Sequence, residues 1–141
     1  QPSTRGTVDS HNWSSRLVLP GYTNYNDESI ADLSRGNYFL MFLGTVILVP
    51  PVEECLYRGL IFRNLYKKSH WAAYVISIAA FACLHILGYI GTYSPSGLII
   101  AFLQYIPAGL WLAWSYIKGE SIFVPILIHA AVNFITIRSI L

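Results

Sequence analysis

Apolar residues form four long stretches in this chain, separated by short polar segments, at residues 38–62, 71–87, 98–117 and 121–141. A transmembrane helix needs roughly 17–25 apolar residues, whereas a barrel strand needs only about 9–11. Because lipid offers no hydrogen-bond partner to the backbone, runs of this length must be helical. The pattern therefore predicts an all-α, multi-pass transmembrane bundle with about four visible helices, the first of which contains Pro50 and Pro51. These prolines either kink one spanning helix or begin a second one.

The polar segments set the expected domain organisation and topology. Residues 1–37 are rich in Ser, Thr, Asn, Asp and Gly and predict a polar extramembrane loop or tail, with a short helix at Asp27–Leu33. Residues 38–141 form the predicted transmembrane domain. Residues 63–70 read as a basic turn, which the positive-inside rule places in the cytoplasm. The protein is expected to be an integral membrane protein, in the cell membrane if bacterial or in the endoplasmic reticulum if eukaryotic.

Composition narrows the class of protein. Only 11% of the residues are charged and 55% are apolar, against roughly 25% charged in soluble domains. The net charge of +2 comes without a basic run, so no nucleic-acid partner is expected. Cys55 and Cys83 lie inside apolar stretches, where cysteine behaves as a small hydrophobic residue. The chain begins with Gln and shows no signal peptide, so we expect a fragment or a processed form of a longer membrane protein.

Two adjacent carboxylates interrupt the first apolar stretch. Glu53 and Glu54 are the only acidic residues of the sequence between Ser34 and Gly119, and Arg58 follows four residues after Glu54. Residues four apart share a helix face, so Arg58 can pair with Glu54. Glu53 points about 100° away around the helix and can act as a general base. Because a carboxylate is costly to place in a membrane, the pair predicts a functional site.

The later stretches supply two imidazoles and an amide. His85 lies in the second stretch, and His129 and Asn133 share one helix face in the fourth. If these faces meet Glu53, then Glu53 and His85 can orient and deprotonate a water. His129 and Asn133 can donate hydrogen bonds to the oxyanion of an attacked amide. Taken singly, each has a structural explanation: a buried histidine can bond a backbone carbonyl, and Asn133 can join two helices.

A metal site is an alternative reading of the same residues. Two histidines and a glutamate form a ligand set that zinc uses in catalytic sites, with an open position for water. Glu53, His85 and His129 would bind zinc or another divalent metal. They come from three different helices, however, so no local ligand spacing supports a metal. From the spacing alone, the metal and metal-free readings stay equally open.

Three motifs in this order resemble those of the CPBP family, the CAAX proteases and bacteriocin-processing (Abi) intramembrane proteases. Glu-Glu-Cys-Leu-Tyr-Arg at 53–58 is similar to the family's Glu-Glu-x-x-x-Arg, and Phe-Ala-Cys-Leu-His at 81–85 to its Phe-x-x-x-His. His-Ala-Ala-Val-Asn at 129–133 is similar to its last motif, His-x-x-x-Asn or Asp. The resemblance covers roughly residues 40–137. Each motif alone is weak, but the ordered set is specific.

The resemblance implies an intramembrane endopeptidase, either of the type that processes prenylated CAAX proteins or of the type linked to bacteriocin maturation and self-immunity. It implies that Glu53 activates water with His85 as its partner, while His129 and Asn133 form the oxyanion hole. The second glutamate and the arginine of the first motif support the site. The family is commonly labelled metalloprotease, yet the resemblance slightly favours a metal-free, glutamate-dependent mechanism. Its members have several helices before the double-Glu motif, which again favours a fragment.

Two other functions fit parts of the sequence. One is a non-catalytic immunity or binding protein on the same scaffold, which would not need Glu53. The other is a proton-coupled transporter, in which Glu53 and the histidines titrate during transport. The expected partners are membrane lipid and a peptide or prenylated protein substrate. The ordered motifs favour the peptidase.

Overall fold

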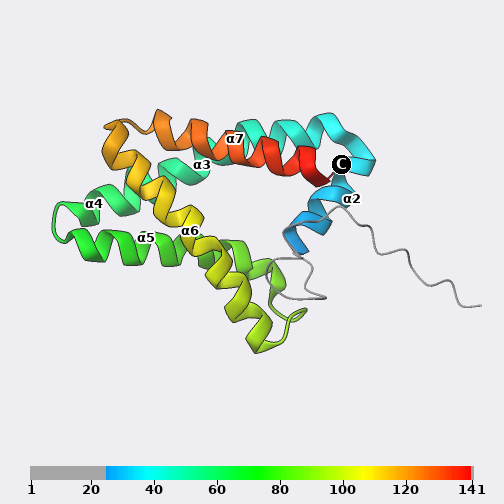
Figure 1. Ribbon diagram of the computed structural model, residues 1–141, viewed down its shortest axis with the longest axis horizontal. Coiled ribbons are helices and arrows are strands. Elements are labelled where there is room, and N and C mark those ends of the chain that lie inside the picture. Colours follow the sequence, from blue (N-terminus) through cyan, green and yellow to red (C-terminus); the bar gives the residue numbers. More distant parts are fainter. Residues whose placement is uncertain (1–24, 141) are drawn as a thin grey trace, which may run out of the picture.

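The computed structural model describes residues 25–140, and every regular element in this part of the chain is helical (Figure 1). The all-α prediction is therefore confirmed. In chain order the elements are α2 (Tyr25–Phe42), the π-helix η1 (Leu43–Leu48), α3 (Val49–Glu54), the π-helix η2 (Cys55–Phe62), α4 (Arg63–Tyr66), α5 (His70–Ile86), the short 3-10 helix η3 (Leu87–Tyr89), α6 (Pro95–Gly119) and α7 (Phe123–Ile140).

The first apolar stretch is one long helical span. Within α2 the backbone of Asn37 is extended (φ −157°, ψ 93°), and its Oδ1 accepts a hydrogen bond of 3.1 Å from the Leu40 N–H. Asn37 thus caps a new helical segment where polar sequence gives way to apolar. The helical chain then continues through both prolines, and Arg35–Tyr66 is long and apolar enough to cross a membrane. The short helix expected at Asp27–Leu33 is part of α2.

Two π-helical segments flank α3, which carries the double glutamate. Proline has no N–H, so the two prolines in the first turn of α3 disrupt the regular α-helical ladder, and η1 lies directly before them. The segment η2 follows the glutamates directly and carries Arg58. Its Tyr57 carbonyl accepts a hydrogen bond of 3.2 Å from the buried Ser77 hydroxyl of α5. Such π-segments occur often at functional sites.

The basic turn expected at residues 63–70 is shorter in the structure. Arg63–Tyr66 continues the helix as α4, and α5 already begins at His70. Ser69 caps α5 by accepting a hydrogen bond of 3.3 Å from the Ala72 N–H. The expected turn was too long by four residues at its start because Arg63–Tyr66, with a single charged residue, continues the preceding helix, and the basic turn is confined to residues 67–69.

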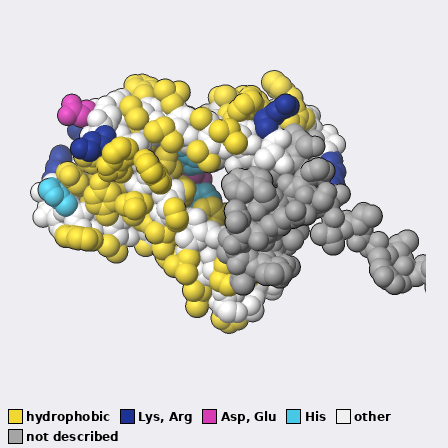
Figure 2. Space-filling view, in the orientation of Figure 1, with side chains coloured by type: hydrophobic (Ala, Val, Ile, Leu, Met, Phe, Trp, Pro, Cys, Tyr) yellow, Lys and Arg dark blue, Asp and Glu magenta, His cyan; other side chains and the backbone are white. Residues whose placement is uncertain are grey.

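Two further helices, His70–Tyr89 and Pro95–Gly119, are long and apolar enough to cross a membrane. Phe123–Ser139 is a shorter apolar helix, so three of the four expected spans meet the length criterion in the described part of the chain. Large apolar side chains cover much of the face shown in Figure 2. Exposed apolar surface of this extent marks contact with lipid, as in an integral membrane protein.

The helices pack in two groups that share α6. α5 packs against α6 and η2, whereas α7 packs along α3 and η1 (Figure 1). At the end of the molecule near α4, the fully buried Phe62 contacts three tyrosine rings at centroid distances of 5.0 to 6.0 Å. These aromatic contacts join η2, α5 and α6. They fix the first span against the helix that carries His85.

Gly119 allows the close turn between α6 and α7. A Cβ atom at this position would lie 2.5 Å from the Cγ2 of Val124, a contact that the stiff branched side chain cannot relieve. We expect Gly119→Ala to lower the free energy of unfolding by about 1–3 kcal/mol. Thermal unfolding in detergent measures this change. Gly44→Ala is the control, because nothing lies within 4 Å of its added Cβ, and an equal loss in both variants would contradict the packing argument.

Candidate active site

Polar side chains from four helical elements meet in the interior between the two groups of helices. The double glutamate comes from α3, Arg58 from η2, His85 from α5, and His129 and Asn133 from α7. Five of these six side chains form a connected set of short contacts, and Asn133 is anchored separately. The contacts fall into three groups, around Glu54, around Glu53 and at Asn133.

Glu54 is the centre of the buried part of the site. Its Oε1 accepts a hydrogen bond of 3.1 Å from the Arg58 Nη1 and lies 2.8 Å from the His129 Nδ1. Glu54 and Arg58 are both completely buried. A carboxylate oxygen that accepts from a guanidinium can also accept from an imidazole N–H, so Glu54 orients the His129 ring.

Arg58 ties this carboxylate to the neighbouring helices. Its Nη2 donates a hydrogen bond of 3.0 Å to the Gly109 carbonyl of α6. Its guanidinium carbon lies 5.0 Å from the centre of the Phe81 ring on α5, within the range of a cation–π contact. Arg58 therefore contacts three helical elements besides its own, and the i, i+4 pairing with Glu54 is the one that the sequence predicts.

Glu53 faces the two histidines rather than the arginine. Its Oε2 lies 3.9 Å from the Nε2 of His85 and 3.8 Å from the Nε2 of His129. These distances are too long for direct hydrogen bonds, and polar groups so spaced can be joined by a water. Among the described residues no hydrogen-bond partner reaches this buried oxygen. The Glu53 side chain nevertheless keeps 15% exposure, whereas Glu54 has none, so Glu53 is the accessible carboxylate of the pair.

The second nitrogen of each ring determines what its Nε2 can do. The His85 Nδ1 lies 2.8 Å from the Phe81 carbonyl, which can only accept a hydrogen bond, so Nδ1 carries the proton. The His129 Nδ1 likewise donates to Glu54. In the neutral rings both Nε2 atoms are therefore acceptors, and each becomes a donor when the ring is protonated. Both reactive nitrogens point toward the same oxygen of Glu53.

Asn133 lies one helical turn beyond His129. Its Nδ2 donates a hydrogen bond of 2.9 Å to the Thr45 carbonyl of η1. This contact is the interhelical role that an isolated asparagine often has in a membrane protein. An amide nitrogen has two hydrogens, so one remains for another acceptor. The Thr45 carbonyl belongs to a π-helical segment, which no pattern in the sequence predicts.

Aromatic rings enclose His85 on two sides. Phe81 lies 4.3 Å and Tyr105 4.4 Å from its ring centroid, and the Tyr105 hydroxyl is 3.1 Å from that of Tyr89. No sequence pattern marks Tyr105 as a site residue, because a tyrosine in an apolar helix usually packs against neighbours or anchors at the membrane–water interface. Only the packing of α6 on α5 brings it to the site.

The candidate metal ligands Glu53, His85 and His129 lie on three different helices. In the described part of the chain, no group of three or more His, Cys, Asp or Glu side chains is arranged so that it could hold a metal ion. Glu53 Oε2 and the Nε2 atoms of His85 and His129 do converge, at distances of 3.9 and 3.8 Å, and these three atoms can also share a water.

A family model described as type II CAAX prenyl endopeptidase Rce1-like matches residues 35–135 of the chain. The matched region begins at the first span and includes all six residues of the site. In comparisons with curated proteins and with solved structures, nothing matches the chain.

Proposed function

Because the chain belongs to the Rce1-like family of type II CAAX prenyl endopeptidases, we propose that Glu53 activates a water molecule for hydrolysis of a peptide bond at the membrane. Membership of this protease family makes the chain an intramembrane endopeptidase with a peptide or protein substrate. The observation that carries the mechanism is the convergence of both histidine Nε2 atoms on Glu53 Oε2. It supports one shared position for a water.

The first step is attack by water. A water between Glu53 and His85 donates one hydrogen to the Glu53 carboxylate and the other to the His85 Nε2, so its lone pair faces the substrate. Glu53 removes a proton as the water oxygen bonds to the carbonyl carbon. The protonated Glu53 then gives this proton to the leaving amine, which restores the carboxylate as the peptide bond breaks.

The second requirement is a donor for the oxyanion that forms on the substrate. The His129 Nε2 donates to it when the ring is protonated, and Glu54 stabilises that form through Nδ1. The remaining Asn133 hydrogen is the second candidate donor. Glu54 and Arg58 do not touch the substrate in this mechanism. They hold His129 at a fixed angle and distance from Glu53.

The substrate class follows from the family. We propose that a prenylated protein with a C-terminal CAAX sequence is cleaved after its modified cysteine, by an enzyme that crosses the membrane several times. Bacteriocin maturation remains the second substrate type of the wider family. The exposed apolar surface of the helices allows a lipid-modified segment to approach from within the bilayer.

The substrate class is tested by comparing protein termini in membranes. Membranes that contain the wild type and membranes that contain Glu53→Ala are analysed by mass spectrometry for new peptide ends. Termini that are absent with the variant and lie after a prenylated cysteine support the proposal. New termini at other sequences would show that the substrate belongs to another class. Identical termini with the wild type and with a folded Glu53→Ala variant would favour the immunity or binding role. Flux that depends on a proton gradient, without proteolysis, favours a transporter.

Metal removal tests the proposed water activation. We expect hydrolysis to be unchanged after incubation with EDTA or 1,10-phenanthroline, because the Glu53 carboxylate removes the proton without a Lewis acid. A zinc peptidase treated in parallel should lose its activity. Loss of hydrolysis that added zinc restores would contradict the metal-free mechanism and revive the ligand set of Glu53, His85 and His129.

A further inference from the structure

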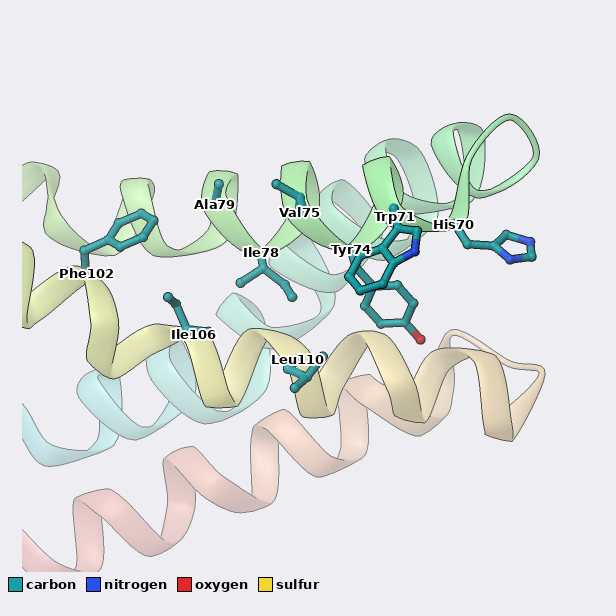
Figure 3. Close-up of a pocket in the computed structure, with 9 residues that line it drawn as sticks. All are labelled: His70, Trp71, Tyr74, Val75, Ile78, Ala79, Phe102, Ile106 and Leu110. Atoms are coloured by element: carbon teal, nitrogen blue, oxygen red, sulfur yellow. The ribbon is translucent and has the colours of Figure 1, made fainter.

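A second feature of the molecule is an apolar groove between α5 and α6 (Figure 3). Its volume is about 590 Å³, and its walls are almost entirely apolar side chains. Val75, Ile78 and Ala79 of α5 face Phe102, Ile106 and Leu110 of α6 across it. At one end the lining includes His70, Trp71 and Tyr74, whose rings carry a nitrogen or a hydroxyl, and the His70 ring points outward from this end. The groove therefore has an apolar body and one polar end.

The groove faces away from the candidate active site. Ser77, whose hydroxyl bonds the Tyr57 carbonyl, lies on the inner face of α5. Val75 and Ala79 are each two residues from Ser77, and two residues correspond to about 200° around a helix. Val75 is also 61% exposed. The groove thus opens toward the lipid.

The length of the groove matches one leaflet of a bilayer. From His70 to Ala79 the α5 axis rises by about 14 Å, at roughly 1.5 Å per residue. Half of the hydrocarbon core is about 15 Å thick. A groove that starts at the interface and ends near the midplane has the length of a single lipid chain.

Positive charge gathers at the polar end. The exposed Lys67 and Lys68 lie in the turn directly before α5, and the exposed Lys118 lies at the last turn of the antiparallel α6. Figure 2 shows lysine or arginine and histidine side chains at this end of the molecule, with acidic side-chain atoms at one place nearby. Glu120 is the acidic residue of the α6–α7 turn. The three lysines outnumber this one glutamate, so the net charge at this end is positive and complementary to an anion.

The His70 ring and the Trp71 ring complete an interfacial site. His70 stacks on Tyr66 of α4 at a centroid distance of 4.1 Å, beyond the end of the groove. Trp71 is 83% exposed, and tryptophan is enriched where the bilayer meets water. These residues mark the level of lipid head groups at the same end as the lysines.

We infer that the groove binds one anionic phospholipid, with an acyl chain between α5 and α6 and its phosphate at the His70, Lys67 and Lys68 end. Basic pockets beside membrane helices bind anionic head groups in this way. The inference does not depend on the proposed peptidase activity, because its test measures lipid binding alone.

Native mass spectrometry of the delipidated protein tests the inference. The protein in detergent is titrated with phosphatidylglycerol or with phosphatidylcholine of the same chain length. We expect one tightly bound phosphatidylglycerol per protein, with a Kd roughly 10- to 30-fold below that of phosphatidylcholine, since each lysine near a head group contributes about fivefold. Equal Kd values, or many equivalent weak sites, would overturn the inference.

Matched variants locate the head group and the chain. Lys67→Gln with Lys68→Gln should remove most of the preference, whereas Arg138→Gln, an exposed basic residue at the far end of α7, should leave it unchanged. Ala79→Phe should weaken the binding of both lipids by filling the groove. A preference that survives the lysine changes would overturn the head-group assignment. Displacement of the bound lipid by a farnesylated peptide would instead assign the groove to the substrate.

Discussion

Glu53→Gln is expected to lower kcat for peptide hydrolysis by about 10²- to 10⁴-fold, the usual range for loss of a general base. Glutamine keeps the size and the hydrogen-bonding atoms of glutamate but cannot take a proton from water. Among the described residues no arginine or lysine forms a salt bridge with the Glu53 side chain, whose Oε2 lies 3.8 and 3.9 Å from the Nε2 atoms of the two histidines. The thermal unfolding temperature should therefore change little. Rates are measured with purified protein in vesicles.

A matched glutamate separates this effect from a general loss of charge. Glu120 is exposed in the turn after α6, so Glu120→Gln should keep the wild-type kcat. Retained hydrolysis in Glu53→Gln would remove the base assignment. A fall in the unfolding temperature together with kcat would show a structural role for Glu53, and His85→Gln would then be needed to test the water position from its other side.

Arg58→Ala is expected to cost about 3–5 kcal/mol in the free energy of unfolding, because it leaves a buried charge without its partner. Glu54 is completely buried, and Arg58 supplies one of the two hydrogen bonds to its Oε1. The variant also loses the hydrogen bond to the Gly109 carbonyl. Activity should fall too, since Glu54 would no longer hold the His129 ring firmly. Equilibrium unfolding in detergent and hydrolysis rates measure the two effects.

Arg63→Ala is the control for Arg58. Arg63 is exposed on α4 and should change stability by less than about 0.5 kcal/mol. Combining Arg58→Ala with Glu54→Gln tests the cause, since removal of the buried charge should recover part of the stability but not the activity. An unchanged unfolding temperature in Arg58→Ala would contradict the account of the buried ion pair.

The helical fold and the pairing of Glu54 with Arg58 followed from the length of the apolar runs and from local spacing in the sequence. Long apolar runs required helices, and the four-residue spacing placed Arg58 beside Glu54, as the structure shows. The same spacing left Glu53 on another face, where both histidines meet it. The helix length and the pairing of Glu54 with Arg58 are local relations, so a single sequence contains them. The meeting of both histidines with Glu53 was expected only on the condition that the three helix faces pack together.

Other parts of the site depend on packing that local spacing does not encode. The sequence did not predict that His129 bonds Glu54 through one nitrogen and faces Glu53 with the other, because this depends on the register of α7 against α3. The contact of Asn133 with Thr45 depends on a π-helical segment. Tyr105 reaches His85 only because α6 packs on α5. The region before residue 25 lies outside the described residues, so the polar tail stays a prediction there.

The central claim is that this chain hydrolyses a peptide bond with Glu53 as the base. It is tested most directly by mass spectrometry of a farnesylated peptide with a C-terminal CAAX sequence, incubated with the purified full-length protein in vesicles. The account predicts release of the last three residues by the wild type and by Glu120→Gln, and no release by a folded Glu53→Gln variant. Release at the wild-type rate by Glu53→Gln would contradict it, as would a peptide that stays intact with every protein, the wild type included.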